Sequence, residues 1–186
     1  MTRGRALLLK LLQIYSYQGY EHSKLEVQKL AYLLQESGLN LRLKYKPHNF
    51  GPYADNLNHV LNEIDGHYIK GFGDRVSKSE ITLIPKAIDK ADRFLENDDE
   101  AKRHLEKVRK LIEGWETPLS LEVLSTVHWS AKELEYEYLN CEVVKREVFN
   151  WNERKRRIKE KYIEKAYDKL LNEGWIFENQ DNDLNR

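Results

Sequence analysis

Carboxylates and tyrosine rings alternate in one short stretch of this 186-residue chain, ELEYEYLNCE at positions 133–142. The side chains concerned are Glu133, Glu135, Tyr136, Glu137, Tyr138 and Glu142. Carboxylates can imitate phosphates and aromatic rings can imitate stacked bases, so the pattern is the inverse of a surface that binds single-stranded DNA. It also fits an exposed acidic loop with two half-buried tyrosines, because runs of charge are usually solvated.

A second group of candidate residues lies in the segment LRLKYKPHNFGPYADNLNHVLNEIDGHYIKGFGD at positions 41–74. Its glycines and prolines are turn-forming residues. Tyr53, Asn56, His59 and His67 instead carry side chains that could touch a partner. We therefore expect a second contact patch at these four residues.

A basic cluster lies further along the chain, at Arg154, Lys155, Arg156, Arg157 and Lys159. Such a cluster could contact phosphates, but we expect it to be the solvated start of a helix. The chain has 31 Lys and Arg against 31 Asp and Glu, whereas nucleic-acid binders usually carry a basic excess. Direct DNA binding is therefore an alternative that the sequence does not favour.

Catalytic and metal-binding patterns are weak. The six histidines form no HxxxH pair, and zinc needs three or four converging ligands. The single cysteine, Cys141, lies among glutamates that would raise the pKa of its thiol, which is the wrong direction for a nucleophile. The sequence has no GxSxG elbow, no Walker loop and no GxGxxG motif. We expect no catalytic residue, no metal and no cofactor.

Apolar periodicity and cap residues define the elements that must position these side chains. Ser23, followed three residues later by Glu26, has the pattern of a capping box. The predicted helices cover residues 3–18, 24–37, 52–65, 85–97, 98–113, 117–134, 143–149 and 159–173. The predicted extended segments are a strand at 41–46, a hairpin at 67–72 and 80–84, and a short end at 174–177. Between the first strand and the next helix, Pro47 and Pro52 predict an irregular connection.

The predicted fold is mainly α, a helical domain with a small antiparallel β element between residues 41 and 84, a short strand plus a hairpin that resembles a winged helix. We expect one domain over residues 1–177, with an N-terminal lobe at 1–97, a C-terminal helical part at 98–177 and a disordered tail at 178–186. No apolar run approaches the roughly 20 residues that span a bilayer. The lone cysteine fits the reducing cytoplasm.

Several motifs resemble the C-terminal domain of the DarG antitoxins, which are partners of the DarT DNA ADP-ribosyltransferase toxins. The matching segments run from residue 2 to residue 177: TRGRALLL, LEVQKLAYLLQESG, LRLKY, GPYADNLNHVLNEIDGHYIKGFGD, TVHW, FNWNERK and LNEGWIF. The KLAYLLQ and GPY arrangement also resembles the Panacea antitoxin domain.

The resemblance implies a bacterial, non-enzymatic antitoxin domain that binds and inhibits a DarT-type toxin by blocking its single-stranded DNA site. Full-length DarG proteins also carry a macrodomain that removes ADP-ribose from DNA, and we expect this chain to lack it and to be an excised fragment. The toxin contacts would be the acidic, DNA-mimicking stretch and the second patch: Tyr53, Asn56, His59, His67, Glu133, Glu135, Tyr136, Glu137 and Tyr138. The alternative function is a winged-helix DNA-binding, autoregulatory module.

Overall fold

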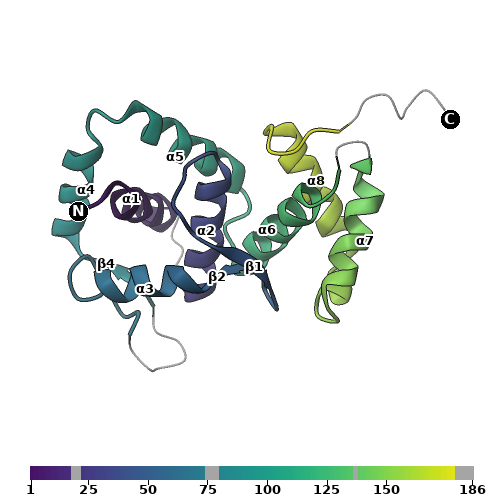
Figure 1. Cartoon of the computed structure of the whole chain (residues 1–186), viewed down its shortest axis with the longest axis horizontal. Helices are drawn as coiled ribbons and strands as arrows, with labels where there is room; N and C mark the ends of the chain where they lie inside the picture. The colour runs from purple at the N-terminus through teal and green to yellow at the C-terminus, as the bar shows by residue number, and fades with distance from the viewer. Residues whose placement is uncertain (18–21, 74–79, 136–137, 179–186) are drawn as a thin grey trace.

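The computed structural model describes residues 1–17, 22–73, 80–135 and 138–178, and it is mainly helical (Figure 1). The helices are α1 (Arg3–Tyr17), α2 (Lys24–Glu36), α3 (Asp55–Ile64), α4 (Pro85–Leu95), α5 (Asp99–Ile112), α6 (Pro118–Lys132), α7 (Cys141–Trp151), the 3₁₀ turn η2 (Lys155–Arg157) and α8 (Glu160–Asn172). The strands are β1 (Tyr45–His48), β2 (Gly51–Ala54), β3 (Ile69–Lys70) and β4 (Thr82–Leu83). These elements confirm the predicted class, a helical fold with a small antiparallel element.

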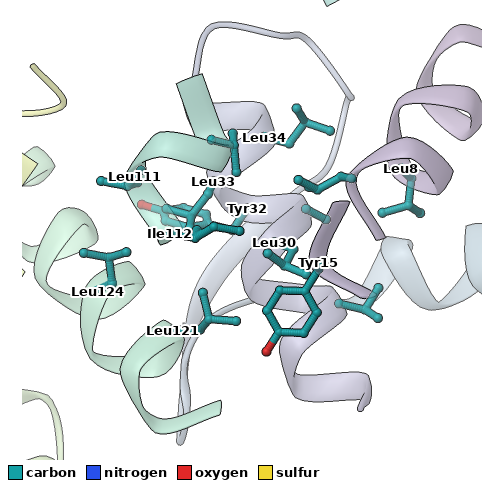
Figure 2. Close-up of a cluster of buried hydrophobic side chains, with 14 of the residues drawn as sticks. Leu8, Tyr15, Leu30, Tyr32, Leu33, Leu34, Leu111, Ile112, Leu121 and Leu124 are labelled. Carbon is teal, nitrogen blue, oxygen red and sulfur yellow. The ribbon is translucent and has the colours of Figure 1, made fainter. Parts of the chain in front are cut away.

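Helix α2 lies between α1 and α6 and packs against both (Figure 1). The Ser23 hydroxyl accepts from the Glu26 backbone N–H, and the Glu26 carboxylate accepts from the Ser23 N–H, so the predicted capping box is present. Leucines and tyrosines of α1, α2, α5 and α6 meet in one core (Figure 2). Tyr15 and Tyr32 are fully buried in it, and the Tyr32 hydroxyl lies 2.8 Å from Nδ1 of His128.

Strands β1 and β2 form an antiparallel hairpin in which Pro47 is opposite Pro52. The prediction of an irregular connection at these prolines was therefore wrong. A two-stranded ribbon consists only of edge strands, where a proline can leave its missing N–H on the unpaired side. Gly51 makes the turn possible because its φ of +92° suits glycine alone.

Side-chain amides take the place of a strand partner for the segment just before β1. The Gln35 amide bonds both the N–H and the C=O of Leu43, at 2.9 and 3.0 Å. The Asn56 amide bonds the Lys44 N–H and the Arg42 C=O, both at 2.9 Å. The first four residues of the strand predicted at 41–46 therefore form an irregular loop held by α2 and α3.

The second predicted hairpin is present as the short pair β3–β4, in which Ile69 is opposite Leu83. Gly71 lies so close to the returning chain that a Cβ would come within 2.3 Å of the Glu80 carbonyl oxygen. The glycines of this block therefore have a local structural role.

Helix α6 joins the two ends of the molecule, because it packs against α2 on one side and against α7 and α8 on the other (Figure 1). Trp175 and Ile176 follow α8 and are buried, and they form no strand. Within the described residues no helix is both long and apolar enough to cross a membrane. The cytoplasmic location stays a prediction, and the tail predicted to be disordered lies, from residue 179 onward, outside the described residues.

Candidate functional site

Two motifs about 100 residues apart in sequence meet where the β1–β2 hairpin touches the end of α7. The Trp151 indole N–H donates to the His48 carbonyl at 2.8 Å. The Asn152 amide donates to the Asn49 carbonyl at 3.2 Å. The hairpin turn is thereby tied to the start of the basic cluster, through contacts that no local sequence pattern encodes.

A buried ionic network lies beneath this contact. Glu122 of α6 and Lys155 of η2 have side-chain exposures of 3% and 0% and form a 2.7 Å ion pair. Arg154 reaches the other carboxylate oxygen at 3.1 Å. Burial raises the pKa of the Glu122 carboxyl, but the hydrogen bonds from Arg154 and Lys155 outweigh it, so that the net shift is downward. The carboxylate is thus ionised and fully engaged.

Lys29 of α2 belongs to the same network. It is 1% exposed, and its Nζ donates to the Pro52 carbonyl at 2.6 Å. Burial, with a smaller repulsion from Lys155, lowers the pKa of Lys29 to about 7. A Cβ on Gly51 would lie 2.6 Å from Oγ1 of Thr126 and 3.5 Å from this amine. The absence of a side chain at Gly51 is therefore what lets the hairpin close over the network.

The outer face of this junction is basic and aromatic. The Arg154 guanidinium lies 4.7 Å from the centre of the exposed Phe50 ring. Arg156, Arg157 and Lys159 follow Arg154 within five residues of the chain and are exposed. Two of them, Arg156 and Lys159, line a cavity of about 630 Å³ together with Phe149, Asn150, Ile158 and Glu160.

We call Phe50, Arg154, Arg156, Arg157 and Lys159 the junction surface. Cationic side chains can bind phosphates, and an exposed aromatic ring can stack on a base. The junction surface therefore has the chemistry of a single-strand nucleic-acid contact.

The structure separates the four residues of the predicted second patch into two kinds. The Tyr53 ring stacks on His48 at 4.9 Å between centroids, and its hydroxyl accepts from Asn58. Asn56 holds the loop before β1, as described above. His59 and His67 are exposed. Asn56 therefore has a structural function, whereas His59 and His67 are open to a partner.

The acidic stretch follows α6. Glu133 is the C-cap residue of that helix, and Glu135 and Tyr138 are exposed, Tyr138 by 60%. Tyr136 and Glu137 lie outside the described residues. A contact role for this stretch stays a prediction.

Charged residues inside the core were missed by sequence reasoning. Lys29 and Glu122 lie within apolar helix segments, KLAYLL and LSLEVL, and a charged residue in such a segment is the signal that could have identified them.

Burial raises the pKa of Cys141 to about 11, which agrees in direction with the expectation from its glutamate neighbours. Burial lowers the pKa of His128 to about 3, so that its ring is neutral. In the part of the chain that the structure describes, no three His, Cys, Asp or Glu residues gather around a metal position.

Comparison with known proteins relates this chain to enzymes. It is 42% identical over 175 residues, 94% of its length, to a protein of Thermus aquaticus named DNA ADP-ribosyl glycohydrolase. Proteins of the same name from Mycobacterium tuberculosis and Mycobacterium bovis are each 32% identical over 149 residues, 70% of the chain. The chain spans about half the length, 42–48%, of these curated relatives. No model of a known protein family matches it.

These relatives agree with the DarG resemblance in part, because their name is the activity expected of full-length DarG proteins. They contradict the expected function. A non-enzymatic antitoxin that works by binding and inhibiting a toxin was the wrong expectation, since the relatives are named as hydrolases that act on ADP-ribosylated DNA.

Proposed function

We propose that this chain takes part in the enzymatic removal of ADP-ribose from DNA. The observation that carries the proposal is its 42% identity, over 94% of its length, to a DNA ADP-ribosyl glycohydrolase. Removal of ADP-ribose presupposes a reaction that attaches it, so a DNA ADP-ribosyltransferase of the DarT type is the opposing activity.

The contribution that we propose for this chain is to hold the DNA. The junction surface supports this role because Arg156, Arg157 and Lys159 are exposed and no ion pair links them to a carboxylate among the described residues. Phe50, held by Arg154, adds an exposed ring at the same place. Phosphate contacts supply most of the affinity of a sequence-independent site, and base stacking adds to it.

Helix α3, the recognition helix of the winged-helix alternative, is less suited to this role. Its charged residues are acidic, Asp55 and Glu63, and they pair with Lys46 and Arg5. A helix without a cation of its own has little to attract phosphates. DNA binding, if it follows this geometry, takes place at the junction surface.

A charge-reversal experiment tests the proposal. The variant is Arg156→Glu/Arg157→Glu/Lys159→Glu, and the matched control is Lys86→Glu/Lys90→Glu/Arg93→Glu, which reverses three exposed cations of α4. Fluorescence anisotropy with a labelled single-stranded oligonucleotide, plain or ADP-ribosylated, should show binding that weakens as salt rises. The junction variant should bind at least tenfold more weakly, whereas the α4 control should bind like the parent chain.

The same oligonucleotide serves as a substrate. Release of ADP-ribose, followed by the mass of the DNA, would support direct participation in the chemistry, and binding without release would support the DNA-holding role. A chain that neither binds nor releases at low salt would contradict the proposal. Equal weakening in both charge-reversal variants would contradict the assignment to the junction surface.

A further inference from the structure

A second basic site lies on α5, away from the junction surface. A cavity of about 570 Å³ is lined by Lys102, Arg103, Glu106, Lys107, Lys110 and Glu173. All but Glu173 come from α5, where neighbours in the cavity lie three or four residues apart, which places them along one face. The opposite face of α5 is buried in the core, so this orientation is fixed by packing.

The carboxylates in this cavity are already engaged elsewhere. Both oxygens of Glu106 accept from the Arg109 guanidinium, at 2.8 and 2.7 Å. Glu173 forms its ion pair with Lys169 at 3.0 Å. Neither carboxylate forms an ion pair with Arg103, Lys107 or Lys110 among the described residues, so both offset the positive charge of the cavity only in part.

Three cations remain without a carboxylate partner in the described part of the chain: Arg103, Lys107 and Lys110. Arg103 and Lys107 are four residues apart, which places like charges side by side on a helix and is unfavourable. Lys107 is held in place because its Nζ lies 4.8 Å from the centre of the Trp175 ring. A mobile anion that enters the cavity would relieve the repulsion.

We infer that this α5 cavity binds a phosphate-bearing ligand. Arginine and lysine bind phosphate oxygens through charge-assisted hydrogen bonds, and the cavity volume falls within the range of about 300–1,000 Å³ typical of small-molecule sites. Two ligands share this chemistry in a protein related to DNA ADP-ribosyl glycohydrolases, the diphosphate of ADP-ribose and the DNA backbone. The site is independent of the junction surface.

Isothermal titration with ADP-ribose and with an unmodified oligothymidylate tests this inference. The variant is Arg103→Glu/Lys110→Glu, which spares Lys107 and its contact with Trp175. The control is Lys86→Glu/Lys90→Glu on α4, and thermal unfolding confirms that both variants fold. We expect at least a tenfold loss of affinity in the α5 variant and none in the control.

The two ligands separate the sources of phosphate. The site is assigned to the nucleotide if two results are found together. ADP-ribose binding is saturable and is lost in the α5 variant, and the triple junction variant leaves it unchanged. Loss of oligonucleotide binding alone assigns it to the DNA backbone. If binding of neither ligand depends on the α5 cations, the inference is wrong, and this result leaves the DNA-holding role of the junction surface untouched.

Discussion

A lysine amine without access to water is costly in a folded protein unless it is neutral or paired. Lys29 is such a residue, since among the described residues its Nζ donates to the Pro52 carbonyl and forms no ion pair, and burial lowers its pKa to about 7. Between pH 7 and the unfolded value of 10.5, the unfolded chain binds the Lys29 proton and the folded chain does not. Protonation there favours unfolding, so the free energy of unfolding should rise with pH across this window.

Substitution of Lys29 by methionine tests this pH dependence. The parent chain should gain on the order of 1 kcal/mol of stability between pH 7 and pH 8.5 from this residue, and Lys29→Met should lack that gain. Urea denaturation at several pH values measures the slope, with Lys86→Met on the surface of α4 as a control that keeps it. An identical slope in all three proteins would show that Lys29 does not titrate in this range.

At the scale of the elements, the β1–β2 hairpin depends on the absence of a side chain at Gly51. Gly51→Ala would place a Cβ 2.6 Å from Thr126 Oγ1 and force a non-glycine residue to φ +92°. We expect the free energy of unfolding to fall by about 2–4 kcal/mol, since strained backbone and overpacking each cost about 1–3 kcal/mol. Gly66→Ala is the matched control, because Gly66 has a φ of +76° and open space around it. Equal losses in urea denaturation would remove the steric explanation.

The same hairpin shows where prediction from sequence ends. The helices followed from apolar periodicity, and the capping box at Ser23 followed from two residues three positions apart. Pro47 and Pro52 were interpreted as breaks, because the rule that excludes proline from strands holds for central strands and not for a two-stranded ribbon. The amide of Asn56, which was predicted to contact a partner, donates to the backbone 14 residues away. Such long-range hydrogen bonds leave no periodic signal.

At the scale of the whole molecule, the ion pair between Glu122 and Lys155 connects α6 with the segment that carries the junction surface. Sequence reasoning placed this charge on a solvated face, because charge clusters usually are solvated, and only the fold shows that Lys155 is buried. Removal of one partner leaves the other charged and desolvated, which typically costs about 3–5 kcal/mol. Replacement of both by apolar residues avoids that cost.

A double-mutant cycle measures this coupling. Glu122→Leu alone should destabilise the chain by about 3–5 kcal/mol because Lys155 and Arg154 lose their carboxylate. Glu122→Leu/Lys155→Met should recover most of that loss, since no buried charge remains at the pair. If the double variant is less stable than Glu122→Leu, the buried Lys155 is not costly without its partner, and the desolvation argument fails. Oligonucleotide binding by the folded double variant then reports whether the Glu122–Lys155 pair also orients Arg154 and Phe50. Unchanged affinity would limit the function of the pair to joining the two parts of the molecule. A weaker affinity would extend that function to the junction surface.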